Sequence, residues 1–378
     1  MTQHVSPQSL SLFDLIARSW DLGAPVRAVR FNVVGGSVAV TLGDGRLAFL
    51  QTKDGETPES RMRTELDTGR MTIRPREKPL PMPLVTEAPV TGCETGIATL
   101  AQQGFAFVSP DGTEIWRATA RGQTVRVAKV GPEPVTALAT LPEKRGIVVA
   151  QGTRLIVVSP EDGRTLATAE PGHAVQRLAV SPEGTRIACW GPGRVSVLDA
   201  ETLAQRAGTS AEGEVSDLVW SPDGRWLVGS CRDKALLLVD VPAARADCIV
   251  DFPAPVTVSD FSRKAGVLVA AGAFRVVGWR LPDLPFGDHE GEPIETGKPG
   301  LTIVETVAAH PHRDLCAVGY ANGLVTLCQI GQRAEMMLRE GNGDPATALA
   351  WSPDGAHLAI GTAGGTAALA TFPKHMFK

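Results

Sequence analysis

The stretch VSDLVWSPDGRWLVGSCRDKALLLVDV, residues Val215–Val241, contains three short apolar segments separated by two polar turns. The first turn, Ser221-Pro222-Asp223-Gly224, is a strong turn signal. Proline presets φ for the second turn position, and glycine accepts the positive φ that ends such a turn. The stretch therefore predicts three antiparallel strands. A meander of this size cannot bury both of its faces alone, so it needs similar neighbours.

Those neighbours are present along the chain as seven further copies of the same pattern. The clearest copies are residues 175–202 and 346–372, the weaker ones are 26–52, 135–163, 256–282 and 304–330, and the faintest is 95–118. Equivalent positions in most copies are about 40 residues apart, which is the period of four-stranded propeller blades. The sequence therefore predicts an all-β fold, with one closed β-propeller domain over residues 1–378.

Eight units favour eight blades, with seven as the alternative because the unit at residues 95–118 is faint. An outer fourth strand is expected after every unit except the last, where only six residues follow Phe372. An open ring would expose long unpaired strand edges, which closed architectures avoid. We therefore expect residues within Leu10–Trp20 to supply the outer strand of the last blade.

The composition bounds the location and the partners. The net charge is −4 and no basic tract occurs, so neither nucleic acid nor an anionic membrane is an expected partner. No basic segment precedes a long apolar run, and no apolar window reaches membrane-helix length, which favours a cytoplasmic protein. The six cysteines lack disulfide or zinc-knuckle spacing. Cys189 and Cys231, in expected second strands, are best interpreted as small core hydrophobes.

Two segments interrupt the repeat, residues 53–89 and 282–300, and both are expected to be loops. The first is charged, rich in proline and without a sustained period, except for a possible outer strand at Met71–Arg74. Such a segment is either a solvated surface loop or a partner-binding segment, and the sequence leaves both interpretations open.

The repeats resemble WD40 repeats over nearly the whole chain. The SPDG turns with apolar flanks, the pairs Gly229-Ser230 and Gly361-Thr362 that end second strands, and Gly172-His173 before the fourth unit are all similar to the family pattern. However, no repeat ends in Trp-Asp, and no unit keeps the full set of His, Ser or Thr, Asp and Trp. Such degenerate repeats resemble those of bacterial WD40 proteins, and the resemblance implies a scaffold that binds other proteins.

No catalytic arrangement stands out. The residue types of a metal site occur at His310, His312, Cys316 and Cys328, but His-Pro is a frequent filler of this turn in WD40 repeats and the cysteines lie mid-strand. The glycine pairs predict hairpin turns rather than phosphate cradles, because no lysine follows and no helix begins. Converging histidine and carboxylate residues, which a propeller enzyme would need in its first strands, are judged to be missing. We therefore expect no enzyme activity, no cofactor and no metal, with zinc binding at those four residues as a minor alternative.

The leading hypothesis is a non-enzymatic scaffold for protein–protein interaction, acting as a single propeller within a larger complex. One alternative is an accessory protein in zinc homeostasis that works with a CobW-type GTPase, because the end of the chain resembles bacterial WD40 proteins associated with such GTPases. A second alternative is a propeller enzyme. In the WD40 arrangement one face carries the links between blades and the turns between second and third strands. On that face we expect Trp20, Arg27, His173, Glu214, Arg232 and Asp344.

The segment Pro75–Pro89 supplies the remaining candidates for partner binding. If Met71–Arg74 forms the outer strand of the first blade, the segment runs onto the same face. Its prolines limit the entropy lost on docking. We therefore expect it to form part of the partner interface or to regulate access to the face, through Arg76, Lys78, Leu80, Met82 and Leu84.

Overall fold

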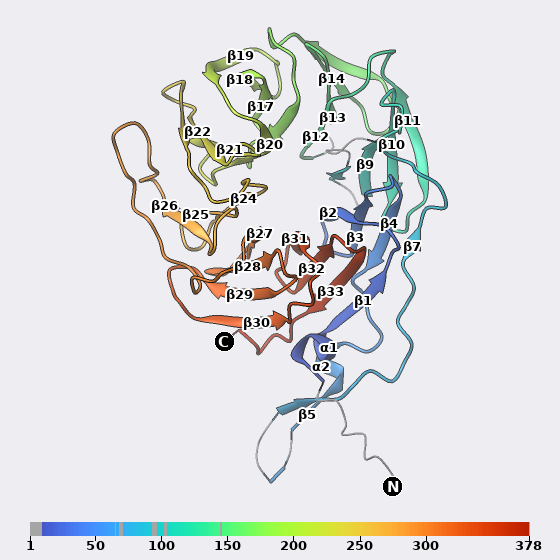
Figure 1. Cartoon of the computed structure of the whole chain (residues 1–378). Coiled ribbons are helices and arrows are strands. Elements are labelled where there is room, and N and C mark those ends of the chain that lie inside the picture. Colours follow the sequence, from blue (N-terminus) through green and yellow to red (C-terminus); the bar gives the residue numbers. More distant parts are fainter. Residues whose placement is uncertain are drawn as a thin grey trace.

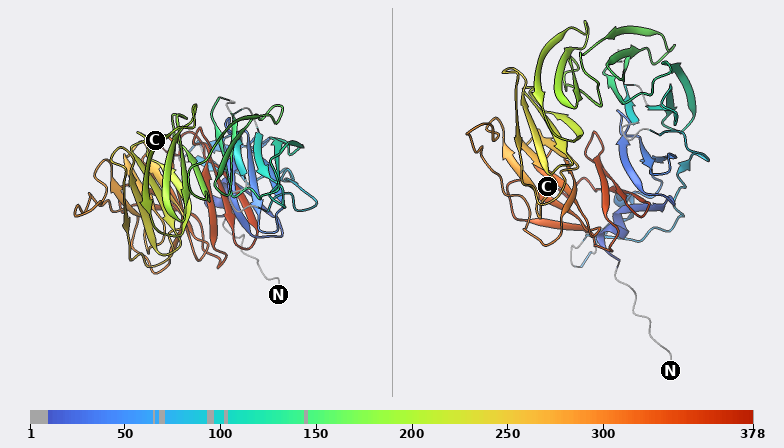
Figure 2. Two further views of the ribbon diagram at one scale, coloured as in Figure 1. Left: turned by 90° about the horizontal axis from the view of Figure 1, so that it is seen from above. Right: turned by 45° about the horizontal axis from the view of Figure 1, so that its top comes forward.

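The computed structural model describes residues 10–64, 66–67, 71–92, 97–101, 104–143 and 146–377. These residues form eight sheets that stand side by side as blades in a closed ring around a central channel (Figure 1). Turned by 90°, the ring is a thick disc with the strands running across it (Figure 2). The expectation of an all-β propeller with eight blades is confirmed, and the faint unit supplies the second blade.

The first four blades follow the chain from its blue end to its green middle (Figure 1). Blade 1 consists of β2 (Val26–Phe31), β3 (Ser37–Leu42), β4 (Leu47–Gln51) and β7 (Leu84–Val85). Blade 2 consists of β8 (Ile97–Leu100), β9 (Gly104–Val108), β10 (Glu114–Thr119) and β11 (Thr124–Lys129). Blade 3 consists of β12 (Ala137–Leu141), β13 (Gly146–Gln151), β14 (Arg154–Val158) and β15 (Thr165–Ala169). Blade 4 consists of β16 (Arg177–Val180), β17 (Arg186–Gly191), β18 (Gly193–Asp199) and β19 (Gln205–Ala211).

The other four blades complete the ring and bring the chain back to its start. Blade 5 consists of β20 (Val215–Trp220), β21 (Trp226–Cys231), β22 (Ala235–Asp240) and β23 (Arg245–Ile249). Blade 6 consists of β24 (Ser259–Ser262), β25 (Val267–Ala270) and β26 (Val277–Arg280). Blade 7 consists of β27 (Val304–Ala309), β28 (Leu315–Tyr320), β29 (Val325–Gln329) and β30 (Glu335–Arg339). Blade 8 consists of β31 (Ala346–Trp351), β32 (His357–Thr362), β33 (Thr366–Thr371) and β1 (Ala17–Asp21).

The turn between the first two strands forms because its side chains bond its own backbone. In blade 5 the Ser221 hydroxyl donates to Asp223 Oδ1 and accepts from the Trp226 amide at 2.8 Å. Gly224 closes the turn at φ +67°, a left-handed conformation that suits glycine. The equivalent turn in blade 8 repeats these bonds, so the sequence signal and the structure agree.

The core is a ring of interfaces between blades. Every residue of β21 and β22 is buried, whereas the outer strand β15 has no buried residue. One hydrophobic cluster joins Trp190 and Val197 of blade 4 to Leu227 and Leu237 of blade 5. Cys189 and Cys231 are buried in such clusters, as expected of small core hydrophobes. Each blade therefore depends on its two neighbours, which is the reason a single meander would not fold alone.

Blade 6 departs from the expected four strands. Its three strands are the only regular ones among its described residues, so the expectation of an outer strand after every unit but the last is wrong here. Part of the segment 282–300 runs beside β26 instead. The Arg280 amide donates to the Glu292 carbonyl, and the Ile294 amide donates to the Gly278 carbonyl. The edge is thus covered without a regular strand, because prolines in this segment cannot donate along a ladder.

The ring closes in the way predicted from the last unit, which has no room for its own fourth strand. Strand β1 pairs antiparallel with β33, from Ala17 opposite Ala370 to Asp21 opposite Thr366, so both ends of the chain share blade 8. The helix α1 (Leu12–Ile16) precedes β1 and buries Ile16. The expectation that residues within Leu10–Trp20 close the last blade is confirmed. Within the described part of the chain, no helix is long and apolar enough to cross a membrane.

The outer strand of blade 1 is not where the sequence suggested. Residues Met71–Ile73 form β6 and pair with β5 (Met62–Thr64) in a separate two-stranded hairpin. The short strand β7 pairs with β4 through Ala48 and Phe49 instead. The expectation that Met71–Arg74 is an outer blade strand is therefore wrong. Its pattern is that of a strand, but its partner is the neighbouring segment, just before it in the chain.

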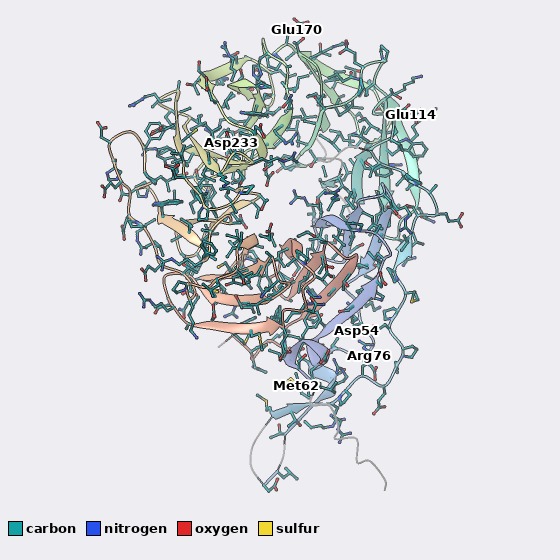
Figure 3. All side chains as sticks on the ribbon, in the orientation of Figure 1. Asp54, Met62, Arg76, Glu114, Glu170 and Asp233 are labelled. Carbon is teal, nitrogen blue, oxygen red and sulfur yellow. The ribbon has the colours of Figure 1, made fainter. Side chains whose placement is uncertain are left out.

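A charged cluster fastens the insertion after β4 to the closing blade. Its members, here called the closure latch, are Arg18, Asp54, Glu56, Arg61 and Arg76. Asp54, with a side chain 5% exposed, accepts from Arg76 Nη2 and lies 3.8 Å from Arg18 Nε. Arg18 Nη2 also donates to two carbonyls at the end of β4. Figure 3 shows Asp54 and Arg76 side by side at the rim of the ring.

The same insertion touches both ends of the propeller domain. Arg61, at the end of helix α2 (Pro58–Arg61), donates from Nη2 to the Leu15 carbonyl at 2.5 Å. Glu59 of α2 accepts from the Lys374 amide at 2.8 Å. The solvated-loop interpretation is therefore wrong for this part of the insertion, which packs against the closure.

Candidate partner-binding face and central channel

One face of the ring carries the links between blades and the turns between second and third strands; we call it the linker face. Its loops are held by backbone hydrogen bonds between links and turns, which fix them without help from a partner. These bonds join the Gly43 amide to the Pro25 carbonyl, Val135 to Gly112, Val175 to Gly152, Arg232 to Glu214, Val256 to Cys231, Ala321 to Ile303 and Ala363 to Pro345, at 2.7–3.0 Å. The linker face is therefore a set of preformed loops on a rigid ring.

Three of the expected residues lie on the linker face with their side chains accessible or half-buried. Glu214 and Arg232 are exposed and adjacent, because the Arg232 amide donates to the Glu214 carbonyl. Asp344 is half-buried and accepts from the Gly364 amide. Glu214 and Arg232 can thus meet a partner directly, while Asp344 fixes the loops of blade 8.

His173 is held by the protein itself. Its Nδ1 lies 3.0 Å from the Ala174 carbonyl oxygen, and its Nε2 lies 3.0 Å from Ser196 Oγ. Burial lowers the pKa of His173, and the nearby charge of Arg194 lowers it further. The neutral ring therefore donates from Nδ1 and accepts the Ser196 hydroxyl at Nε2. Both nitrogens are used inside blade 4, so His173 positions a loop rather than offering a free group.

Trp20 and Arg27 differ sharply in exposure. Trp20 is only 7% exposed on the outer strand β1, and its Nε1 donates to the Pro81 carbonyl at 3.0 Å. The expectation that Trp20 is displayed on the linker face is therefore corrected, because the proline-rich segment covers the indole. Arg27 is exposed at the start of β2, next to the Gly43 turn, where it lines the mouth of the channel.

The segment Pro75–Pro83, here called the rim strap, runs along the outside of the ring beside β1 before it forms β7. Arg76 is half-buried in the closure latch, and the Lys78 amide donates to Glu56 while its side chain is exposed. Leu80 is half-buried, and Met82 is 84% exposed.

Beyond the rim strap, Leu84 of β7 is 50% exposed. The chain reaches the linker face only after β7, where the Val90 and Thr91 amides donate to the Gly45 carbonyl. The expected path of Pro75–Pro89 over that face is thus wrong for most of its length, because the outer strand lies at its end rather than before it.

The residues with metal-like chemistry do not converge. His310 Nδ1 accepts from the His312 amide, and His310 Nε2 donates to the Gly355 carbonyl, which leaves no ring lone pair for a metal. Cys316 and Cys328 are buried opposite each other on β28 and β29. Burial raises the pKa of Cys328 to about 11 and that of Cys316 well above its usual range. Among the described residues, no group of three or more His, Cys, Asp or Glu side chains is placed to hold a metal ion.

The central channel encloses a cavity of about 580 Å³, lined from the first strands of the blades. Its charged lining residues are Arg27, Arg30, Arg177 and Asp217. In four blades the first strand carries a register shift at its second residue, as between Val215 and Asp217. Such a bulge redirects side chains, which brings charged groups to the channel from strands that otherwise read as apolar.

Two carboxylates lie in first strands, Asp217 in β20 and Asp260 in β24. Burial raises the pKa of Asp217, although Arg30, the Leu218 amide and Arg177 lower it. Burial raises the pKa of Asp260 to about 6, against the lowering effect of two backbone amides and of Arg30. The signal was present in the repeated letters VSD at residues 215–217 and 258–260. These letters do not mark a carboxylate site by themselves, because polar residues in first strands also fit the repeat pattern.

Comparison with known families agrees with this geometry. A model described as "WD domain, G-beta repeat" matches residues 204–240, which span the outer strand of blade 4 and three strands of blade 5. A model described as "Anaphase-promoting complex subunit 4 WD40 domain" matches residues 307–374 in blades 7 and 8. The molecule is an eight-bladed β-propeller with WD40 repeats in these segments. The first match begins one strand before its blade, the same offset that leaves β1 to close blade 8.

A similar curated protein is WD repeat-containing protein 36 of Homo sapiens. It is 37% identical over 67 residues, which are 17% of this chain and 8% of that protein. The chain therefore matches only a small part of that relative. The likeness supports the WD40 repeat and carries nothing of the relative's activity or partners.

Proposed function

We propose that this WD40-type propeller is a non-enzymatic cytoplasmic platform whose linker face binds another protein. The observation that supports the proposal is the set of backbone hydrogen bonds that joins links to turns around the ring. Loops that are already fixed lose little conformational entropy when a partner docks, which favours affinity and specificity. WD40 propellers generally mediate protein interactions, and the whole chain is proposed to act as one such unit within a larger complex.

The exposed side chains on blades 4 and 5 form the centre of the proposed interface. Glu212, Glu214, Arg232, Asp233 and Lys234 are exposed on adjoining loops, and Figure 3 labels Asp233 over blade 5. The negative charges outnumber the positive charges here. We therefore propose a partner surface with basic groups opposite this part of the linker face, since complementary charge accelerates encounter and selects the partner.

The test is recovery of partners with tagged full-length protein from its native host, followed by quantitative mass spectrometry. The variant Glu214→Lys with Asp233→Lys reverses two charges on the linker face. The control Asp288→Lys with Glu290→Lys makes the same charge change on exposed residues of the loop after β26, away from that face. We expect the first variant to lose a stoichiometric partner that the wild type and the control retain. Equal recovery from all three proteins would contradict the proposed face.

The rim strap is proposed as a secondary contact. Met82 is almost fully exposed, and Lys78 presents a charged side chain beside it. Replacing the whole strap would also remove Arg76 from the closure latch and disturb β7, so the informative variant is Lys78→Ser with Met82→Ser. We expect this variant to melt like the wild type and to recover less partner. Unchanged recovery would restrict the interface to the linker face.

No observation favours the alternative of a zinc-handling accessory protein, and neither matched family is described as one. The function proposed here therefore remains protein binding.

A further inference from the structure

The central channel is large enough for a small molecule. Its cavity of about 580 Å³ lies within the range of roughly 300–1,000 Å³ that is usual for small-molecule sites. It is lined from the first strands, which the ring holds in place from all sides. A ligand there would meet preformed walls, and its binding would not require a protein partner.

The two sides of the channel carry opposite charges. Blade 1 contributes Arg27 and Arg30 from β2. Blade 5, which is diametrically opposite in a ring of eight, contributes Asp217, and the adjacent blade 4 contributes Arg177. Arg30 lowers the pKa of Asp217, so the two charged walls lie within interaction range across the channel.

Much of this polar lining is not used by the fold. Arg27 and Arg30 are exposed to the channel and form no hydrogen bond or ion pair with a described residue. The carboxylate of Asp217 accepts from the neighbouring Leu218 amide and forms no ion pair in the described structure. Thr41, which also lines the cavity, is 6% exposed, and its hydroxyl has no partner among the described residues.

The charge pattern selects the class of ligand. A simple anion would be attracted to Arg27 and Arg30 and repelled by Asp217, while a simple cation would meet the reverse. A molecule with both charges satisfies both walls at once. We propose that the central channel binds a small zwitterion of the amino-acid or short-peptide class, with its carboxylate toward Arg27 and Arg30 and its ammonium toward Asp217.

The first experiment uses purified full-length protein without a partner. Free L-amino acids and unblocked dipeptides are screened by thermal shift, and the strongest ligand is measured by isothermal titration calorimetry. The same ligand is then measured with its amine acetylated and, separately, with its carboxylate amidated. We expect each blocked form to bind at least about tenfold more weakly, because each block removes a charged partner of one wall. No binding by any unblocked compound at millimolar concentration, or equal binding of the blocked forms, would overturn the proposal.

Variants then assign the two walls. Asp217→Asn and Arg30→Gln should each weaken the unblocked ligand by about tenfold. Asp217→Asn should have little effect on the acetylated ligand, which no longer carries the ammonium, and Arg30→Gln little effect on the amidated ligand. The control Arg263→Gln removes an exposed arginine outside the channel and should bind like the wild type. Wild-type affinity in both Asp217→Asn and Arg30→Gln would show that the ligand binds elsewhere and would reject the channel site.

Discussion

Two places where an arginine acts on an aspartate in this molecule have opposite electrostatic results. In the closure latch, burial raises the pKa of Asp54, but the Glu56 amide, Arg18 and Arg76 together bring that pKa below its usual range. On the first strand β24, burial raises the pKa of Asp260 to about 6, and Arg30 does not offset it. The residue types are the same, and the two pKa values shift in opposite directions because Asp54 touches an arginine whereas Asp260 does not.

The comparison separates charge that holds the fold from charge that remains available. Asp54 touches Arg76 and lies 3.8 Å from Arg18, so its charge is compensated by the protein itself. Asp217, which lines the channel, forms no ion pair with a described residue, although Arg30 is near. A buried charge without a direct partner is costly and is retained where something else uses it. The latch is therefore structural, and the channel is the place to look for a ligand.

The largest expected effect comes from removing the strand that the latch secures. Deleting residues 1–21 removes β1 with Ile16, Arg18 and Trp20, and exposes the whole edge of β33. We expect a loss of unfolding free energy on the order of 5 kcal/mol, because a strand's hydrogen bonds and its buried apolar area are lost together. The measurement is thermal and urea unfolding, with association followed by light scattering because the free edge can pair with other chains.

The control for this truncation is deletion of residues 1–9, which keeps α1 and β1. It should melt within a degree or two of the full-length protein. If the longer truncation melted at the same temperature as this control, β1 would not be the closure that its pairing with β33 indicates.

The next largest effect is expected from a substitution in the closure latch alone. Asp54→Asn leaves Arg18, whose side chain is 3% exposed, without its counter-charge. We expect about 3 kcal/mol of destabilisation, as is usual when one partner of a buried ion pair is removed. The matched comparison is Arg225→Gln in blade 5, which breaks an ion pair whose arginine side chain is 48% exposed and which should cost no more than about 1 kcal/mol. Equal costs for the two variants would show that the latch is no more than a surface ion pair.

The two aspartates should give the stability opposite dependence on pH. The folded pKa of Asp54 is lowered, so its contribution is complete above the unfolded value of about 3.9 and is lost as the pH falls further. The folded pKa of Asp260 is raised to about 6. The folded state therefore binds more protons than the unfolded state between about pH 4 and pH 6, and stability falls as the pH rises through that window.

Urea unfolding from pH 3 to pH 7 measures both effects. The advantage of the wild type over Asp54→Asn should shrink below about pH 4. The stability of Asp260→Asn relative to the wild type should increase by about 1–2 kcal/mol between pH 4 and pH 6. Loss of a hydrogen bond to Ala309 adds a constant offset, which does not change with pH. A flat difference for Asp260→Asn across this window would mean that its carboxyl titrates as in the unfolded chain.

The fold was largely predictable from the sequence because its signals are local and repeated. The Ser221–Gly224 turn fixes one hairpin, and its copies fix the period. The closing strand followed from counting, since the last unit lacked room for a fourth strand. In contrast, β7 has only two residues and follows a proline-rich segment, and no period marks so short a strand. Its partner β4 could not be inferred without the position of the latch.

The site was less predictable because it depends on which way side chains point. The charged residues Arg30, Arg177 and Asp217 are visible in apolar segments of the sequence. The directions of Arg30 and Asp217 depend on a bulge near the start of their strands, as between Val26 and Ala28, and no residue type marks that bulge. Likewise, Trp20 reads as an exposed aromatic until Pro81, far along the chain, is seen to cover it. Long-range contacts of this kind leave no local sequence signal.

The smallest expected effect on stability gives the sharpest test of the comparison. Arg30 forms no ion pair with a described residue, so Arg30→Gln should change the unfolding free energy by no more than about 0.5 kcal/mol. Yet Arg30 lowers the pKa of Asp260, and without it that pKa should rise above its value of about 6. Titration of the carboxyl carbon by NMR measures the shift, with Arg263→Gln as the control for charge outside the channel. A cost above about 1 kcal/mol would instead make Arg30 a structural counter-charge, as Arg18 is for Asp54. An unchanged pKa would show that Arg30 has no electrostatic effect on Asp260.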